Sequence, residues 1–312
     1  MAATGDPRVV TLRNDTWQVG LLPENGGSVA FGRVLVTGVW VDLLRPTPED
    51  RLGEWWDVAS YPLIPWSNRI RHGMLLWDGE DHQLRRWGTE DFAMHGTAVE
   101  FPWRVVDLTP ERAVFEFDSH GYFGVNFPWD FTARVEYALD GRRLNCRTTL
   151  ANADKEEFPA GVGHHPYFVR SLTSPAGTPI GGDVRLQINC ERAYPLTNGM
   201  ADGPAGRIPS AADFRAMRIL GATLVDDCLT GRSGPVAATL EYPGALTIDI
   251  EADDLLSHVV AFIPVGENYL AVEPVSNAND AFTLHARGVN GTGVFVVAPG
   301  ESVSAQFSLL AR

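Results

Sequence analysis

The sequence FTARVEYALDGRRLNCRTTL, residues 131–150, decides the predicted fold. Apolar and polar side chains alternate through residues 131–139, and the alternation resumes at residues 144–150 after the pair Asp140-Gly141. A period of two is typical of strands with one buried face, and an Asp-Gly pair between two such runs is typical of a hairpin turn. The stretch therefore predicts an antiparallel β-hairpin that packs on one side against a core.

The same alternation recurs along most of the chain, interrupted by 31 glycines and 21 prolines. It predicts one further strand and two further hairpins: residues 113–118, residues 237–242 joined to 246–251 through Pro243-Gly244, and residues 293–298 joined to 303–309 through Pro299-Gly300. Many short strands separated by turn residues indicate an all-β chain.

Helical periodicity is scarce. The best short helix is predicted at residues 210–217, with Ser210 as its cap and Asp213 at the capping-box position. The chain is much longer than a seven-stranded sandwich, so we expect a large antiparallel β-sandwich with few short helices. No linker or charge block marks a boundary, and we expect residues 8–312 to form a single domain after a loose N-terminus at residues 1–7.

Composition narrows the class of protein. The 312 residues include 39 acidic and 25 basic side chains, a net charge of −14, which disfavours binding to nucleic acid or anionic membranes. No signal peptide and no membrane-spanning apolar run is visible, so the expected location is the cytoplasm. Cys146, Cys190 and Cys228 lack metal-ligand spacing, and neither a disulfide framework nor a zinc site is expected. A monomer and a homodimer both remain open.

A histidine pair at residues 164–165 is the first candidate for chemistry. On a strand, adjacent His164 and His165 point to opposite faces, and Pro166 places them at a strand end or an edge. Imidazole titrates near neutrality and so can donate or accept a proton. A hydrogen-bonded histidine in a packed turn is the structural alternative.

Glu273 is the second candidate, because it ends the apolar run of residues 269–272. A buried, unpaired carboxylate costs several kcal/mol, so its presence requires either a cationic partner or a function. Burial also raises a carboxyl pKa, which suits a general base. A structural ion pair is the alternative interpretation.

Other candidate hydrogen-bonding groups lie earlier in the sequence than these two residues. Arg69 can donate two hydrogen bonds to neighbouring hydroxyl groups, and Gly96 beside His95 permits a close backbone approach. Several tryptophans in the N-terminal third suit the faces of sugars, although we expect most to fill the core. No phosphate-binding glycine loop, nucleophile elbow or zinc motif is present, so we expect neither a metal nor a cofactor.

These segments together resemble the aldose 1-epimerase (galactose mutarotase-like) family, in the same order along nearly the whole chain. The matching segments are Pro65-x-x-Asn68-Arg69-Ile70-x-x-Gly73 with Asp78-Gly79, His95-Gly96 with Pro102-Trp103, His165-x-Tyr167-Phe168, and Glu273. The resemblance implies a large antiparallel β-sandwich, which agrees with the period-two pattern.

The resemblance also implies residue roles in a mutarotase, an isomerase of carbohydrate metabolism that interconverts the α and β anomers of an aldose without a cofactor. By similarity, Glu273 removes the proton from the C1 hydroxyl, and His165 protonates the ring oxygen. Arg69 and His95 bind the sugar, and Asp226 is the substrate-binding aspartate, with Asp227 as its rival. Asn68 and Trp66, in the Asn-Arg-Ile segment, are further candidate binding residues.

The chain departs from the best-known galactose mutarotases at three points. His164 replaces their Asn, Thr97 follows His95-Gly96 in place of a second Gly, and Glu273-Pro274-Val275 replaces their Glu-Thr-Gln. These departures indicate a divergent branch and leave the sugar open. One alternative is a sugar with an anionic C6 group, such as a sugar phosphate or sulfosugar, contacted by Arg71, Arg85 or Arg86. Another is a non-catalytic carbohydrate-binding protein on the same fold.

Overall fold

The computed structural model describes residues 5–312. The predicted loose N-terminus falls mainly on residues 1–4, which lie outside the described residues. Residues 5–7 form part of a turn, in which the backbone N–H of Val9 donates to the carbonyl of Asp6 at 3.0 Å. Between residues 5 and 312, no helix is both long enough and apolar enough to cross a membrane.

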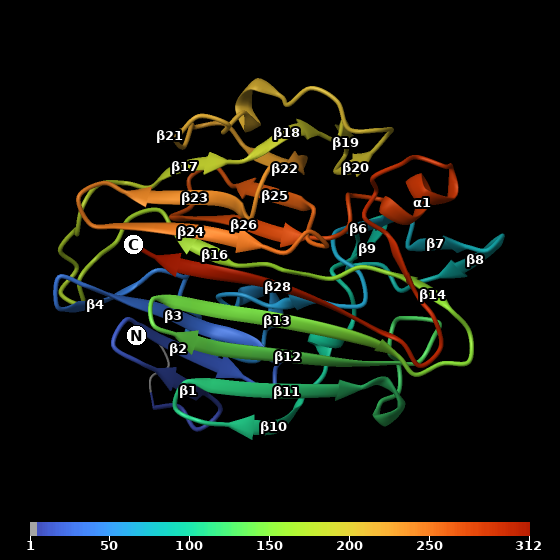
Figure 1. The fold of residues 1–312 in the computed structure, drawn as a ribbon, viewed down its shortest axis with the longest axis horizontal. Helices are drawn as coiled ribbons and strands as arrows, with labels where there is room; N and C mark the ends of the chain where they lie inside the picture. The colour runs from blue at the N-terminus through green and yellow to red at the C-terminus, as the bar shows by residue number, and fades with distance from the viewer. Residues whose placement is uncertain (1–4) are drawn as a thin grey trace.

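The largest sheet has nine strands in the order β10-β11-β12-β13-β28-β24-β23-β17-β21, and most of them lie side by side in Figure 1. Their bounds are β10 (Arg104–Leu108), β11 (Arg112–Asp118), β12 (Phe131–Asp140), β13 (Arg143–Asn152), β17 (Arg185–Ile188), β21 (Arg218–Ile219), β23 (Val236–Tyr242), β24 (Leu246–Ala252) and β28 (Ser302–Ala311). Residues 131–150 form the predicted hairpin, since Tyr137 pairs with Cys146 and Leu139 with Leu144. The hairpin predicted at residues 237–251 is β23 and β24.

A second sheet has seven strands and carries most of the predicted site. Its order is β18-β22-β25-β26-β15-β5, and β16 also pairs with β26. The bounds are β5 (Pro62–Leu63), β15 (Gly163–His164), β16 (Tyr167–Val169), β18 (Cys190–Ala193), β22 (Val225–Arg232), β25 (His258–Ile263) and β26 (Tyr269–Val275). As predicted, the histidine pair lies at a strand end, because β15 ends at His164 and β16 begins at Tyr167, after Pro166.

The remaining strands form smaller sheets. One has four strands, β1 (Val10–Arg13), β2 (Trp17–Leu22), β3 (Ser28–Val36) and β4 (Val39–Asp42). The others are pairs: β6 (Arg69–Arg71) with β9 (Phe92–Met94), β7 (Met74–Trp77) with β8 (Glu80–Gln83), β14 (Phe158–Ala160) with β27 (Phe295–Val297), and β19 (Leu196–Thr197) with β20 (Met200–Ala201).

Helices are few, as expected. Within the described residues the α-helical segment is α1 (Ala281–Ala286), and the 3₁₀ turns are η1 (Glu49–Arg51), η2 (Trp55–Asp57), η3 (Ala98–Glu100), η4 (Ser119–Gly121) and η5 (Ser210–Ala212). The all-β sandwich prediction is confirmed.

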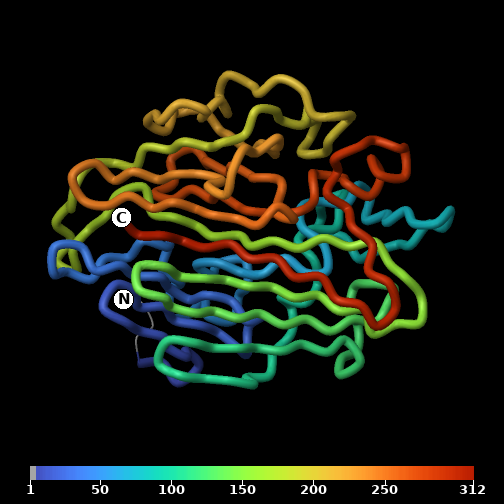
Figure 2. Tube along the Cα trace, in the orientation of Figure 1, coloured from blue at the N-terminus to red at the C-terminus, as the bar shows by residue number. Residues whose placement is uncertain are grey.

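The two large sheets pack face to face, and one core fills the space between them. His164 on β15 shows this contact: its Nε2 lies 2.8 Å from Oγ1 of Thr148 on β13, and its ring lies 4.9 Å from that of Phe307 on β28. Figure 2 shows the long traces of β12, β13 and β28 side by side in this layer. One cluster of buried residues extends from Leu12 to Ala311, and a second, smaller one extends from Leu22 to Leu284. The single domain at residues 8–312 stays a prediction.

The helix predicted at residues 210–217 is wrong beyond its first turn. Only Ser210–Ala212 is helical, Pro209 occupies the cap position, and no side chain caps the turn. Asp213 instead forms an ion pair with Arg215 at 2.8 Å, and the chain becomes extended after it. A local pattern of four residues was therefore insufficient to nucleate a longer helix.

The hairpin predicted at residues 293–309 is also wrong in its pairing. β27 and β28 both form, but β27 pairs with β14, and β28 lies between β13 and β24. Both edges of β28 are therefore occupied, which leaves no edge for β27. Periodicity predicts which residues form strands, whereas the partner is decided by the sheet as a whole.

Candidate active site

His165 and Glu273 meet on the face of the seven-stranded sheet that points away from the nine-stranded sheet. On β26, Leu270 and Val272 belong to the core cluster shared by the two large sheets, so by alternation Glu273 lies on the opposite face. His165 likewise points away from His164. The Nε2 atom of His165 lies 3.2 Å from Oε1 of Glu273, and the side chains are 7% and 2% exposed.

Burial moves the two pKa values in opposite directions. It raises the pKa of Glu273 well above the usual glutamate value; nearby Asp226 adds to the rise, and Arg69 opposes it. Burial lowers the pKa of His165 well below the usual histidine value, and the positive charge of Arg45 acts in the same direction. Each shift disfavours a charge, and at 3.2 Å the two groups are close enough to share one proton between them. Such a pair contains both a proton donor and a proton acceptor.

Aromatic rings fix the imidazole of His165 from two sides. The ring of Tyr61 is stacked on it at 4.9 Å with an interplanar angle of 21°, and the ring of Tyr167 lies 4.4 Å away. The backbone N–H of His165 donates to the carbonyl of Tyr61 at 3.0 Å. The guanidinium of Arg45 lies 3.9 Å above the ring of Tyr167. The imidazole is therefore held in one orientation toward Glu273.

Arg69 and Asp226 form the polar side of the site. Arg69 begins β6, Asp226 lies on β22, and Nη2 of Arg69 donates to Oδ2 of Asp226 at 2.9 Å. Both side chains remain partly exposed, at 19% and 29%. Asp226 and not its rival Asp227 lines the cavity, as adjacent strand residues must point to opposite faces.

His95 is placed beside Arg69 by the pairing of β6 with β9. The His95 N–H donates to the carbonyl of Asn68 at 3.0 Å, and the His95 ring lies 5.3 Å from that of His165. Burial and the nearby positive charge of Arg69 lower the His95 pKa to about 3, so His95 is neutral at physiological pH. Gly96 is required here, because an added Cβ would lie 2.1 Å from the carbonyl oxygen of Ile64.

These side chains surround one cavity of about 180 Å³. It is lined by Trp55, Trp56, Tyr61, Asn68, Arg69, Met94, His95, His165, Tyr167, Asp226, Val260, Phe262 and Glu273. The cavity combines the acid–base pair with hydrogen-bonding groups and aromatic surface, the mixture found in small-molecule sites.

Six of the seven residues predicted from the sequence line this cavity, and Trp66 is the exception. Its side chain is fully buried, belongs to the core cluster, and stacks on Phe127 at 6.1 Å. The structure therefore places Trp66 in the core, and this corrects the prediction that Trp66 contacts the substrate. Trp56, which is 40% exposed, lines the cavity instead.

Sequence reasoning missed the aromatic residues that shape the site. Tyr61 and Tyr167 contact His165 directly, and Tyr167 was recognised only as part of a motif. The signal for Tyr61 was its place directly before the proline-rich segment that carries Arg69. Nothing in the sequence pattern distinguished Trp56 from Trp66.

His95, His165 and Glu273 are also the residues that could hold a metal ion. One donor atom from each lies within 4.8 Å of the others, all three side chains are buried, and two imidazoles with one carboxylate suit a transition metal. The same three groups are equally suited to proton transfer and hydrogen bonding, and a chelation experiment separates the two roles.

The three arginines considered for an anionic C6 group do not line the cavity. Arg71 pairs with Asp280 and Asp202, Arg85 pairs with Glu100, and Arg86 pairs with Asp91. Their charges are therefore compensated elsewhere, and they provide no support for an anion contact.

The fold of this protein is similar to that of known structures. The structure superimposes on that of a galactose mutarotase-like protein from Clostridium acetobutylicum with a TM-score of 0.83 and 18% identity, covering 97% of this chain and 95% of that one. The fold is therefore the mutarotase-like β-sandwich. The chain belongs to the aldose 1-epimerase family, whose sequence model matches residues 11–310.

Two curated relatives come from Escherichia coli K12. The uncharacterized protein YphB is 24% identical over 294 residues, which are 88% of this chain and 91% of YphB. The uncharacterized protein YihR is 26% identical over 227 residues, which are 70% of each. Low identity throughout places the chain in a divergent branch. Family and fold together support a mutarotase-type activity on a small sugar in general terms.

Proposed function

We propose that the protein interconverts the α and β anomers of an aldose by acid–base opening and closing of the sugar ring, without a metal or cofactor. The observation that carries the proposal is the buried contact of 3.2 Å between His165 and Glu273. Anomer exchange needs one proton removed and one added at neighbouring oxygens, and it involves no redox change. A donor and an acceptor in one cavity meet that need, and each contributes roughly 10²–10⁴-fold.

The proposed steps conserve atoms and charge. When the proton shared by the pair resides on His165, Glu273 as the carboxylate takes the proton of the C1 hydroxyl while His165 as the imidazolium gives its proton to the ring oxygen. The bond from C1 to the ring oxygen breaks and leaves an open-chain aldehyde with a hydroxyl at C5. Rotation about C1–C2 presents the other face of the aldehyde. Ring closure then returns a proton from the C5 hydroxyl to His165 and one from Glu273 to the C1 oxygen.

The remaining cavity residues bind the sugar in this proposal. Arg69 and His95 donate hydrogen bonds to ring hydroxyls, and Asp226 accepts one while neutralising Arg69. The aromatic surface of Trp56 packs against the C–H face of the ring.

Exchange measured by NMR tests the proposal. Saturation transferred between the α and β C1 protons of a panel of aldoses should increase in the presence of the protein. The rival is a non-catalytic sugar-binding protein, which would bind an aldose saturably and leave the exchange rate at its buffer value. Comparing neutral sugars with C6-anionic ones then identifies the preferred class.

A further inference from the structure

A short hairpin contacts Arg69 and is not part of the cavity lining. It consists of β19, β20 and the turn Asn198-Gly199, and is called the Gly199 hairpin below. Asn198 and Gly199 have φ values of 51° and 74°, the two left-handed residues that a tight two-residue turn requires. The hairpin is absent from the cavity lining, so it acts on the site only through other residues.

Gly199 contacts the guanidinium of Arg69 directly. Nη1 of Arg69 donates to the Gly199 carbonyl at 3.4 Å, while Nη2 donates to Asp226 at 2.9 Å. A Cβ added at Gly199 would lie 2.7 Å from Nη1, which is closer than real Cβ contacts allow. The guanidinium is therefore enclosed between the hairpin and Asp226, and Gly199 leaves just enough room for it.

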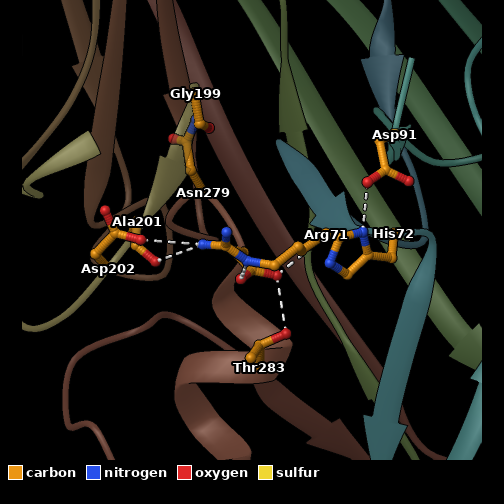
Figure 3. Close-up of polar contacts among 9 residues, drawn as sticks. Arg71, His72, Asp91, Gly199, Ala201, Asp202, Asn279 and Thr283 are labelled. Carbon is orange, nitrogen blue, oxygen red and sulfur yellow. Dashed lines mark hydrogen bonds and ion pairs between the residues drawn. The ribbon is translucent and has the colours of Figure 1, made fainter. Parts of the chain in front are cut away.

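Asn279 and Arg71 fix the hairpin to the rest of the protein. Nδ2 of Asn279 donates to the same Gly199 carbonyl at 2.8 Å. Nη2 of Arg71 donates to the carbonyl of Ala201 at 3.4 Å and to Oδ1 of Asp202 at 3.2 Å. Figure 3 shows Arg71 pointing toward Ala201 and Asp202, with Gly199 and Asn279 next to each other. The turn of the hairpin and the end of its second strand are therefore both fixed by hydrogen bonds.

Arg71 is itself fixed by Asp280, at the start of α1. Its backbone N–H and its Nε donate to the two oxygens of Asp280 at 3.1 and 2.9 Å, and Thr283 Oγ1 donates to Oδ1 at 2.9 Å. The Asp280 N–H donates to the carbonyl of Arg69 at 2.8 Å. Since Arg69 and Arg71 are two residues apart on β6, they project to the same side, and both contact the hairpin.

We propose that the Gly199 hairpin, anchored by Arg71 and Asn279, is a positioning element that holds the Arg69 guanidinium in place for the sugar. The proposal rests on the proposed function in that Arg69 is taken to bind the substrate. Without the hairpin, the partly exposed guanidinium of Arg69 would keep only its hydrogen bond to Asp226 and would sample several rotamers. Ordering it would then cost free energy at each binding event.

The decisive variant is Gly199→Ala, with Gly141→Ala as its matched control. Both glycines have a positive φ in a two-residue hairpin turn, but a Cβ at Gly141 meets nothing within 4 Å. The two variants therefore share the backbone strain and differ in the contact with Arg69. Gly199→Ala should raise KM for anomer exchange about tenfold, the effect of weakening one hydrogen bond to a charged group, with a smaller change in kcat. Gly141→Ala should leave KM unchanged.

A double variant separates positioning from general damage. In an Arg69→Gln background, Gly199→Ala should produce no further rise in KM, because the group that it displaces is gone. Additive effects of the two substitutions would overturn the proposal. Should Gly199→Ala not fold, Arg71→Lys serves, since it loses the contacts to the hairpin while keeping the charge; an unchanged KM in that variant contradicts the proposal.

Crystal structures test the position of Arg69 independently of whether the protein has the proposed activity. The Gly199→Ala structure should show the Arg69 guanidinium moved away from Asp226, and an unmoved guanidinium would refute the positioning role. If the wild type fails to exchange anomers, the proposed function fails, whereas the crystallographic comparison still decides whether the hairpin places Arg69.

Discussion

Nε2 of His165 and Oε1 of Glu273 lie 3.2 Å apart, with Glu273 on β26 and His165 in the link between β15 and β16. β16 pairs with β26, which places the segment after His164 directly beside the strand of Glu273. The core side of the same strands is filled by apolar residues and His164. The fold therefore places His164 in the core and the adjacent His165 at the cavity.

Arg69→Lys should raise KM for the preferred sugar by about 10- to 100-fold, with a smaller change in kcat. Lysine cannot donate to Asp226, Gly199 and a sugar hydroxyl in the planar arrangement that the guanidinium provides. A loss confined to KM is the signature of uniform binding. Arg85→Lys, an exposed arginine outside the cavity, is the control and should behave as the wild type. A normal KM in Arg69→Lys would remove Arg69 from the binding groups.

Trp66→Phe and Trp56→Ala should act on different properties. Trp66 is fully buried, so its substitution should lower the free energy of unfolding by about 1–3 kcal/mol and leave KM unchanged. Trp56 lines the cavity, and its truncation should raise KM about 2- to 10-fold. Steady-state kinetics and urea denaturation measure the two effects. A reversed outcome would restore Trp66 to the site.

Chelation should leave the activity intact. We expect enzyme dialysed against EDTA to keep its full exchange rate, because the proposed steps use only protons. Added Zn²⁺ should inhibit in competition with the sugar, since it would bind the same atoms of His95, His165 and Glu273. Loss of activity on chelation, with recovery on adding a metal, would mean that these residues hold a catalytic ion instead.

Stability should fall as the pH is lowered, in part through His164. Burial lowers its folded pKa from 6.5 to about 3, so the unfolded chain binds a proton in this range that the folded chain does not. The contribution of neutral His164 is complete above its unfolded pKa and decreases as the pH falls toward 3. His164→Asn should therefore flatten the dependence of the unfolding free energy by about 3 kcal/mol between pH 7 and pH 4.

Urea denaturation at several pH values measures this slope. His95 and His258 have pKa values lowered to about 3 and about 4 by burial, so some dependence should remain in His164→Asn. Exposed His285→Asn is the control and should match the wild-type slope. A slope in His164→Asn as steep as that of the wild type would show that His164 titrates normally in the folded protein.

The strands were largely predictable because their signal is local. Alternation at residues 131–150 fixes both the strands and, through Asp140-Gly141, their partner. The pairing of β27 with β14 was not predictable, because it depends on β28 having both edges occupied. Helix α1 was missed because its six residues follow a polar segment that reads as a loop, and Asp280 at its start has a left-handed φ of 57°.

The site was predictable where chemistry marks a residue and unpredictable where only packing does. Glu273 was conspicuous as a carboxylate in an apolar run, and His165 as an imidazole beside a proline. Trp66 and Trp56 carry the same side chain, and only the three-dimensional path of the chain decides which of them is at the cavity. The role of Arg71 was likewise hidden, because Asp280 and the Gly199 hairpin are distant in sequence.

The most direct test of the account is the rate of anomer exchange in Glu273→Gln, measured by polarimetry on a freshly dissolved α-anomer. Glutamine keeps the size of the side chain but cannot take the C1 proton. We expect the rate in Glu273→Gln to fall by about 10²–10⁴-fold with sugar binding retained, while Glu267→Gln, at an exposed position, stays at the wild-type rate. Wild-type exchange in Glu273→Gln would contradict the central claim that Glu273 is the base.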